Sequence, residues 1–245
     1  MFMKASEMIL RVVIFATIVA GVPSFTAFAD DPPAAEPGSE SSQGEATPSG
    51  GAEISEAREE AIPVFNEGVT ALEAEDMATA LEKFREASAI DPDFVDASRA
   101  TAAVAMELQD FQTAADSAEN LVRLDPENVD AIGTAYFAEL MIGDIDRLIP
   151  SARRLADANP SLVSNEMLQH AQVLFDENEW LGSRSLLEVI LEHEPELAPA
   201  YYQLGLTCNM QGDAECAKQA LGKFIELQPE GQDAETAQSL LDYLD

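Results

Sequence analysis

The sequence predicts an all-α protein in which about five similar helical hairpins stack into one elongated solenoid. Two independent sets of residues repeat along the chain with nearly the same period. One is a set of prolines at intervals of 34, 34, 35 and 34 residues: Pro92, Pro126, Pro160, Pro195 and Pro229. The other is a set of acidic residues at the same intervals: Asp76, Asp110, Asp144, Glu179 and Asp213. A unit of this length buries its apolar side only against similar neighbours, so such units form arrays.

One interval in each set is a residue longer than the others. Both sets place the extra residue after Pro160 and before Glu179, where the chain enters the fourth unit. Because the two sets agree, the insertion is a single local event. We expect it to lie in a loop.

Each unit is predicted to contain two amphipathic helices separated by a tight turn. In the first unit, Val64, Gly68 and Ala71 recur at three- to four-residue spacing, and a second apolar run follows Asp76. The Asp76 carboxylate can accept hydrogen bonds from the free amides of the second helix and interacts favourably with its dipole. Pro92 ends that helix, because it has no N–H to donate and favours an extended preceding residue.

The same plan predicts five repeats, with boundaries at 61–94, 95–128, 129–162, 164–197 and 198–231. The residue immediately after each capping acid is expected to pack beneath the turn: Met77, Phe111, Ile145, Trp180 and Ala214. Small residues on the two helices of a hairpin are expected to face one another and allow close approach: Gly68 and Ala80, Ala102 and Ala114, Ala171 and Ser183, Gly205 and Ala217.

Residues 1–29 are predicted to be a cleavable signal peptide. Basic residues flank the start of an apolar run, 12–22, and Ala27 and Ala29 give the small-x-small pattern of a cleavage site. The alternative is an uncleaved anchor in the inner membrane, but the run is shorter than the roughly 20 residues that span a bilayer. We therefore expect an exported protein, in the periplasm, without a membrane span in the mature chain.

Residues 30–60 are predicted to form a disordered acidic linker. The segment is rich in Pro, Gly, Ser and Glu and has very few large apolar side chains. Such a composition does not bury enough apolar surface to offset the entropy lost on ordering. Its expected role is to space the repeats from the export signal, or from a membrane if that signal is retained.

The chain is strongly acidic, with 46 Asp and Glu residues against 13 Lys and Arg and a formal net charge of −33. Such a field repels nucleic acids and anionic membranes and attracts cationic partners. We therefore expect no nucleic-acid binding. The alternative is that the acidity only increases solubility or reflects a saline habitat, in which case it implies nothing about partners.

The fifth unit resembles a known family most clearly. Its residues occupy, in order, the aromatic, Leu-Gly, bulky, Ala, aromatic and terminal Pro positions of the tetratricopeptide repeat: Tyr201, Leu204, Gly205, Cys208, Ala217, Leu221 and Pro229. This resemblance covers 61 to about 231 and implies a right-handed superhelix, with 232–245 as the helix that caps such arrays. The third unit departs from the pattern at Tyr136 and Leu148, so its hairpin is expected to be splayed or shifted.

The sequence contains no recognisable catalytic or metal-binding motif. His170 and His193 have no second ligand at metal spacing, and the two cysteines do not form a Cys-x-x-Cys pair. We expect His170 to lie in the interior and His193 to be exposed. Close acid pairs such as Asp144 and Asp146 are expected by chance in so acidic a chain. The sequence therefore predicts a protein that is not an enzyme and that uses no cofactor and no metal.

Cys208 and Cys216 are a candidate disulfide. They flank the turn of the fifth hairpin, one on each of its helices. An exported protein reaches an oxidising compartment, where such a bond forms and persists. The alternative is a pair of buried thiols that pack as small apolar residues.

In the tetratricopeptide family the first helix of each hairpin lines the concave side, which implies a groove for a peptide or helix. By that resemblance its lining is mostly apolar: Phe65, Val69, Leu72, Met106, Phe137, Leu140, Met141, Phe175, Tyr202, Leu206 and Met210. Aromatic and Met side chains give large and adaptable contact area. Acidic neighbours, Glu73, Glu107 and Asp176, are expected to attract basic flanks of the partner. The alternative is that the apolar residues pack between helices as core.

Some members of this family bind acidic C-terminal tails through a clamp of Lys, Asn and Arg side chains. On the same face this chain has Asn66 and a single cation, Arg99, so we expect no binding of such tails. The sequence therefore predicts an exported scaffold that binds a segment of an envelope protein. The alternative function is a chaperone-like holder of unfolded secreted clients. The sequence leaves the oligomeric state open.

Overall fold

The computed structural model describes residues 55–244, in which every regular element is helical. The chain separates into two units, Met1–Glu59 and Glu60–Asp245, and the second is described over nearly all of its length. The elements in chain order are α2 (Glu56–Glu73), α3 (Met77–Ile90), α4 (Val95–Glu107), α5 (Phe111–Leu124), α6 (Val129–Ile142), α7 (Ile145–Ala158), η3 (Pro160–Leu162), η4 (Val163–Met167), α8 (Leu168–Asp176), α9 (Trp180–His193), α10 (Ala198–Met210), α11 (Ala214–Leu227) and α12 (Gln232–Leu244). The predicted all-α class is confirmed for these residues.

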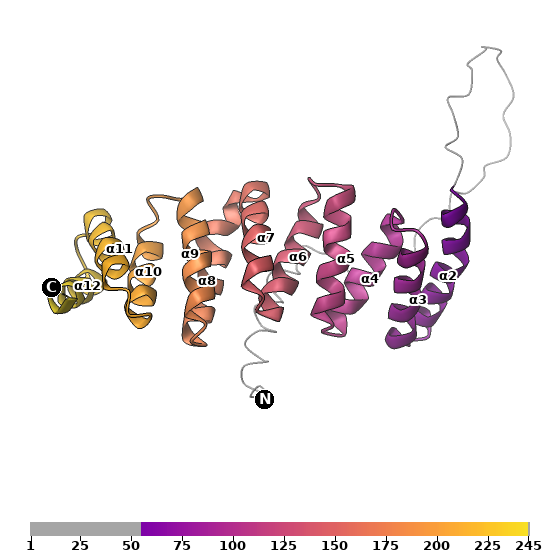
Figure 1. Ribbon diagram of the computed structural model, residues 1–245, viewed down its shortest axis with the longest axis horizontal. Helices are drawn as coiled ribbons and strands as arrows, with labels where there is room; N and C mark the ends of the chain where they lie inside the picture. The colour runs from indigo at the N-terminus through magenta and orange to yellow at the C-terminus, as the bar shows by residue number, and fades with distance from the viewer. Residues whose placement is uncertain (1–54, 245) are drawn as a thin grey trace, which may run out of the picture. The chain divides into compact units, whose positions relative to one another are not determined.

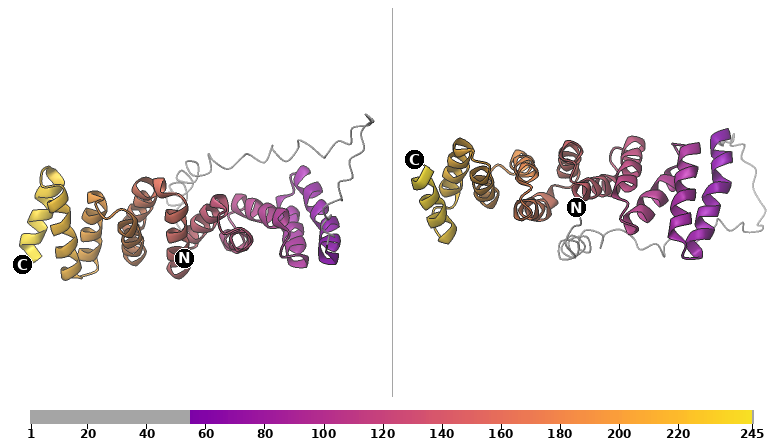
Figure 2. Two further views of the ribbon diagram at one scale, coloured as in Figure 1. Left: turned by 90° about the horizontal axis from the view of Figure 1, so that it is seen from above. Right: turned by 60° about the horizontal axis from the view of Figure 1, so that its bottom comes forward.

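The helices of the second unit form five hairpins that follow one another in chain order, with α12 after the last (Figure 1, Figure 2). The hairpins are α2–α3, α4–α5, α6–α7, α8–α9 and α10–α11. Helices of consecutive hairpins also pack side by side, α3 with α4, α5 with α6 and α9 with α10. The predicted solenoid of helical hairpins is confirmed, and the handedness of its superhelix stays a prediction.

The predicted signal peptide, 1–29, and most of the predicted linker, 30–60, lie outside the described residues. The end of the linker was placed too late, because α2 already begins at Glu56. The Ser55 hydroxyl accepts a hydrogen bond from the Arg58 amide at 3.1 Å, which stabilises the start of this helix. Within the described part of the chain, no helix has both the length and the apolar character needed to cross a bilayer.

Four of the five periodic acids cap the second helix of their hairpin. Asp76, Asp110 and Asp213 each accept a hydrogen bond from the backbone N–H three residues later, at 3.1, 3.2 and 3.1 Å. Asp144 accepts one from the amide two residues later, also at 3.1 Å. Glu179 stands at the same place but makes no side-chain cap, and Glu is not among the residues that favour this position.

The residue immediately before each of these acids forms the turn of its hairpin. These five residues have positive φ angles: Glu75 (60°), Gln109 (58°), Gly143 (77°), Asn178 (66°) and Gly212 (75°). The left-handed conformation turns the chain sharply between the two helices. Only glycine, and to a lesser extent asparagine, adopts it at low cost. The sequence shows no periodic glycine at this position, because Glu and Gln occupy two of the five places.

The residue before each periodic proline is outside the helical region, as predicted. These residues have φ angles between −124° and −143°: Asp91, Asp125, Asn159, Glu194 and Gln228. The clash between the proline ring and a preceding helical residue explains why each second helix ends here.

The extra residue of the fourth unit lies in a helix, so the predicted loop insertion was wrong. Residues Val163–Met167 form a π-helical turn, η4, that runs directly into α8. A π-turn contains one residue more than an α-turn before its hydrogen bond closes, so it absorbs a single insertion within a helix. Val163 and Met167 are both fully buried, and this turn is therefore held by the core.

Two glycines allow close packing within hairpins. A Cβ atom on Gly68 would lie 2.7 Å from the Phe84 ring, and one on Gly205 would lie 2.5 Å from Leu221 Cγ. The closest partners of these glycines are therefore large core side chains, and not the small residues predicted to face them.

The apolar core runs between the helices. One cluster of buried side chains reaches from α5 to α11, and at the C-terminal end Ala234 and Ala237 of α12 pack against Leu221 and Phe224 of α11. Of the residues expected beneath the turns, three are half-buried: Phe111, Ile145 and Trp180. The other two were predicted wrongly, since Met77 and Ala214 are exposed.

Candidate interaction surface

The residues predicted to line a groove lie on the first helices of the five hairpins: α2, α4, α6, α8 and α10. Nine are half-buried, and Met210 is 47% exposed. We call these ten accessible residues the first-helix surface: Phe65, Val69, Leu72, Met106, Leu140, Met141, Phe175, Tyr202, Leu206 and Met210.

Phe137 does not belong to this surface, although the resemblance placed it there. Its side chain is only 4% exposed. The residues of α6 from Ala135 to Glu139 are all buried, so this helix has no polar side in its middle. Because a helix that is apolar all round gives no amphipathic signal, the sequence could not show which side of α6 faces water.

Six residues of the first-helix surface also pack against the buried core clusters, as the alternative reading of these side chains expects: Phe65, Val69, Leu72, Met106, Leu140 and Tyr202. The Phe65 ring packs against the rings of Phe84 and Phe94, with centroids 5.2 and 5.1 Å away. The Tyr202 ring lies 4.9 Å from the Phe224 ring. These two aromatic side chains therefore anchor the first helices as well as contributing accessible area.

The first helices carry very little positive charge. There is no Lys or Arg in α6, α8 or α10, and Arg99 on α4 lies 3.7 Å from the Asp96 carboxylate. Glu73, Glu107 and Asp176 are exposed at the ends of α2, α4 and α8. The first-helix surface therefore combines partly accessible apolar side chains with nearby negative charge.

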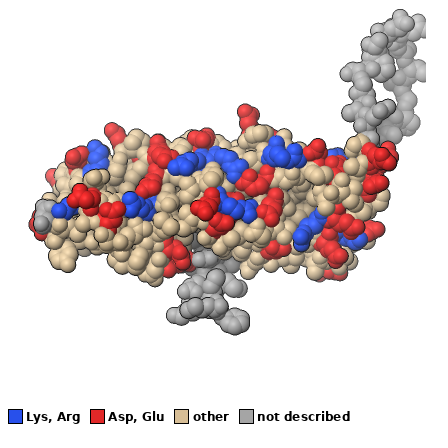
Figure 3. Space-filling view, viewed as in Figure 1, with Lys and Arg blue, Asp and Glu red and all other residues tan. Residues whose placement is uncertain are grey.

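The second helices carry most of the basic residues, and several pair with acids of other helices. Arg153 makes two hydrogen bonds of 2.9 Å to the Glu192 carboxylate, and Arg147 lies 3.0 Å from Asp116. Figure 3 shows Lys and Arg interspersed with Asp and Glu along the face in view. Exposed pairs of this kind contribute only about 0–1 kcal/mol each, so their main effect is to balance charge locally on the second helices.

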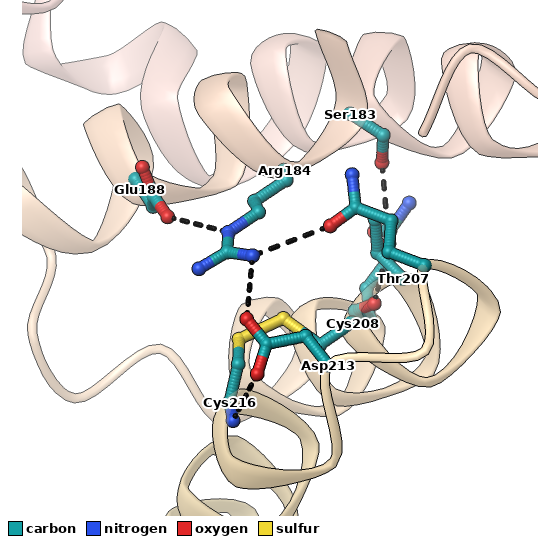
Figure 4. Close-up of a disulfide and its surroundings, with 9 residues drawn as sticks. Ser183, Arg184, Glu188, Thr207, Cys208, Asp213 and Cys216 are labelled. Carbon is teal, nitrogen blue, oxygen red and sulfur yellow. Dashed lines mark hydrogen bonds and ion pairs between the residues drawn. A yellow bond between two sulfur atoms is a disulfide. The ribbon is translucent and has the colours of Figure 1, made fainter. Parts of the chain in front are cut away.

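The turn of the fifth hairpin is fixed by a disulfide, a hydrogen bond and an ion pair (Figure 4). A disulfide joins Cys208 of α10 to Cys216 of α11, with the Cα atoms 5.7 Å apart. Between them, Asp213 accepts a hydrogen bond from the Cys216 amide at 3.1 Å and pairs with Arg184 of α9 at 2.9 Å. The last hairpin is thus closed covalently and linked to the preceding one.

The unusual Tyr136 of the third unit makes a buried hydrogen bond to the fourth. Its hydroxyl lies 2.7 Å from His170 Nδ1. Both residues are 2% exposed, so His170 is interior as predicted. Burial lowers the pKa of His170 to about 4 and raises that of Tyr136, so both are neutral near pH 7. The large Tyr136 side chain, which departs from the repeat pattern, is accommodated by its hydrogen bond to His170 of the next unit.

Glu139 is a second buried polar residue in the third unit. It is 1% exposed and lies 3.3 Å from Arg147 Nε. Burial raises the pKa of Glu139, while a hydrogen bond from Ser151 opposes the shift. Its role is structural, because both partners belong to α7, the other helix of the same hairpin.

His193 is less accessible than the sequence indicated. It is half-buried, and its Nε2 lies 3.0 Å from the Asp157 carboxylate. A backbone hydrogen bond to Val189, followed by the bond to Asp157, raises the pKa of His193. The side chain therefore joins α9 to α7 rather than standing free beside its acidic neighbours.

Over residues 55–244, no three His, Cys, Asp or Glu side chains come together as a possible metal site. A shallow surface depression at the loop between α9 and α10 is lined by Glu194, Pro195, Glu196 and Leu197. It involves none of the predicted site residues.

Hairpins of two helices, a period of about 34 residues, capped second helices and prolines after them together define a tetratricopeptide-type fold. No family model matches the sequence, and a search of curated proteins finds no match. Among solved structures the chain is similar to YrrB, which is described as a TPR protein with an unusual peptide-binding site. The two sequences are 22% identical, the match covers 76% of this chain and 98% of YrrB, and the TM-score is 0.40. The chain is also similar to a TPR repeats protein from Bacteroides fragilis (15% identity, 76% and 99% coverage, TM-score 0.46). A third similar structure is MamA from Desulfovibrio magneticus (14% identity, 73% and 99% coverage, TM-score 0.39).

Proposed function

We propose that this chain is a non-enzymatic scaffold that binds a polypeptide segment of an envelope protein on its first-helix surface. The observation that carries the proposal is the accessibility of apolar side chains on all five first helices, beside exposed acids such as Glu73 and Asp176. Accessible apolar side chains repeated along the array favour contact with another protein. The acids favour segments whose apolar residues are flanked by Lys or Arg.

The scaffold acts outside the cytoplasm, in the periplasm. Two features support this part of the proposal: the N-terminal export pattern and the bond between Cys208 and Cys216, since disulfides persist mainly in oxidising compartments. Intact mass of the protein purified from its own cells tests it. The expected mature chain begins at Asp30, whereas a chain that starts at Met1 and stays with the membranes would support the anchored form.

The binding site is tested by crosslinking in the native envelope, followed by mass spectrometry. The double variant Phe175→Ser/Leu206→Ser removes two accessible side chains of the first-helix surface and is expected to lower recovery of the partner about tenfold. Phe137 is unsuitable for this test, because it is buried. Tyr243→Ser, at a side chain that is 83% exposed on α12, is the matched control. Undiminished recovery with the double variant would contradict the proposal.

The alternative, a holder of unfolded secreted clients, predicts a different result. A holder suppresses aggregation of unrelated reduced proteins and yields many crosslinked species. A scaffold yields one or a few partners and leaves that aggregation unchanged.

A further inference from the structure

The five hairpin turns lie on one side of the second unit, along its lower edge in Figure 1. Each turn exposes one large apolar side chain within three residues of its left-handed residue. These five residues, which we call the turn edge, are Met77 (39% exposed), Leu108 (42%), Ile142 (36%), Leu181 (61%) and Met210 (47%). Elsewhere in the described part of the chain, only three large apolar side chains are as exposed: Val95, Val129 and Tyr243. Scattered apolar residues are normal on surfaces, but one at every turn forms a row.

The same turns are acidic. Each of the segments 73–77, 107–111, 141–145, 176–180 and 210–214 contains Asp or Glu, and none contains Lys or Arg. At four of the five turns the periodic acid is held in place by capping the helix that follows, and only Glu179 makes no such cap. An example is Asp76, whose two carboxylate oxygens bind the backbone amide and hydroxyl of Thr79 at 3.1 and 2.7 Å.

The turn edge is also preorganised. Its backbone is set by the left-handed residues and by the capped helices that follow them, and the fifth turn is closed by the disulfide next to Met210. A surface that is already ordered loses little conformational entropy when a partner binds.

We propose that the turn edge is a second docking surface, and that its partner is a cationic amphipathic segment of another polypeptide. The row of apolar side chains matches one apolar stripe of such a segment, and the acids of the first four turns match Lys and Arg beside that stripe. At the fifth turn the one acid, Asp213, is already paired with Arg184. A second copy of this chain would bring the same negative charge to the contact, and an anionic membrane would be repelled. The surface meets the first-helix surface at Met210 but otherwise consists of different side chains.

The test uses the full mature chain and a synthetic probe, an amphipathic helical peptide made of Leu and Lys. Binding is measured by titration calorimetry at low and high salt. The variant Leu108→Ser/Leu181→Ser changes two turn-edge residues outside the first-helix surface and leaves the net charge unchanged. It is expected to weaken binding of the peptide about tenfold, and added salt is expected to weaken it further.

Val95→Ser/Val129→Ser is the matched control. These valines are 37% and 40% exposed at the first residues of α4 and α6, away from the turns. The control is expected to bind the peptide as the wild type does, which separates docking on the turn edge from general attraction of a cation to an acidic protein. A Leu and Glu peptide of the same pattern is expected not to bind.

Three results would overturn the proposal: equal binding by the turn-edge variant and the wild type, a wild-type dimer that the turn-edge variant abolishes, or binding of phosphatidylcholine vesicles that is lost in that variant. The Phe175→Ser/Leu206→Ser variant is expected to bind the Leu and Lys peptide normally. Failure of the turn edge and failure of the first-helix surface are therefore distinguishable.

Discussion

At the scale of single residues, the turn between α4 and α5 contains a residue with a strained backbone conformation. Gln109 has a φ of 58°, a region in which a Cβ atom is too close to the next carbonyl oxygen. Gly143 and Gly212 occupy the same place in other repeats without this conflict. The strain at Gln109 is local, because its side chain is exposed.

We therefore expect Gln109→Gly to stabilise the protein by about 0.5–1 kcal/mol, because relief of strain exceeds the added freedom of the unfolded chain. The reverse change at the fifth turn, Gly212→Ala, is expected to destabilise it by a similar amount. Urea denaturation measures both. A loss of stability in Gln109→Gly would show that the side chain makes a compensating contact.

The two histidines respond to pH in opposite directions. Burial lowers the pKa of His170 to about 4, whereas the pKa of His193 is raised by its bonds to Val189 and Asp157. Below the unfolded-state pKa of about 6.5, the unfolded chain binds a proton at His170 that the folded chain does not. The folded state therefore loses stability through His170 as pH falls. The raised pKa of His193 has the opposite effect, because the folded chain binds that proton more tightly than the unfolded chain does.

The free energy of unfolding is expected to fall by about 2 kcal/mol through His170 alone between about pH 7 and about pH 5. His170→Asn, which keeps an acceptor near the position of Nδ1 for the Tyr136 hydroxyl, is expected to remove that part of the pH dependence. His193→Gln is the control and is expected to steepen it. Unfolding curves at the two pH values measure the difference, and an unchanged slope in His170→Asn would refute the assignment.

At the scale of elements, caps fix where the helices begin, and small residues such as glycine allow neighbouring helices to pack closely. The Gly205 position on α10 shows this best, since a Cβ there would meet Leu221 of α11 at 2.5 Å and its backbone nitrogen at 3.3 Å. Leu221 is fully buried, so it has no free space into which to move.

Gly205→Ala is expected to destabilise the protein by about 1–3 kcal/mol, because the added methyl group forces α10 and α11 apart. Gly222→Ala on α11 is the matched control. A Cβ at Gly222 meets nothing within 4 Å, and alanine is favoured over glycine in a helix, so this variant is expected to gain about 0.5–1 kcal/mol. Thermal unfolding of the two variants should therefore shift in opposite directions.

The fourth unit shows how an element can absorb an irregularity. The η4 turn, Val163–Met167, keeps the extra residue inside a continuous helical segment. Buried Val163 and Met167 bind this turn to the core, and the next helix resumes its normal packing against α9. The repeat period is thus restored within one helix.

At the scale of the whole molecule, net charge opposes the folded state. Acidic residues outnumber basic ones by 46 to 13, and the exposed ion pairs on the second helices contribute only about 0–1 kcal/mol each. Folding brings the acids closer together, so repulsion among them is greater in the folded array than in the unfolded chain.

Raising the NaCl concentration from about 10 mM to about 500 mM is expected to raise the unfolding midpoint, because salt screens this repulsion. KCl is expected to act equally, since the effect depends on ionic strength. A midpoint that falls with either salt would show that the ion pairs between helices outweigh the net repulsion.

The sequence by itself determined the period, the hairpins and the ends of their second helices. Caps at Asp76 and Asp110 and stops before Pro92 and Pro126 are local effects of one side chain on the adjacent backbone, so spacing reveals them. It also indicated that His170 is interior.

Only the tertiary structure decided which apolar residues stay accessible. Phe137 is buried and Met77 is exposed, although both lie in apolar helical patterns, because burial depends on neighbouring helices that are distant in sequence. Three further features have the same origin: the π-turn after Pro160, the hydrogen bond between Tyr136 and His170, and the row of exposed side chains at the turns. Each arises from packing between repeats, which a periodic sequence pattern does not specify.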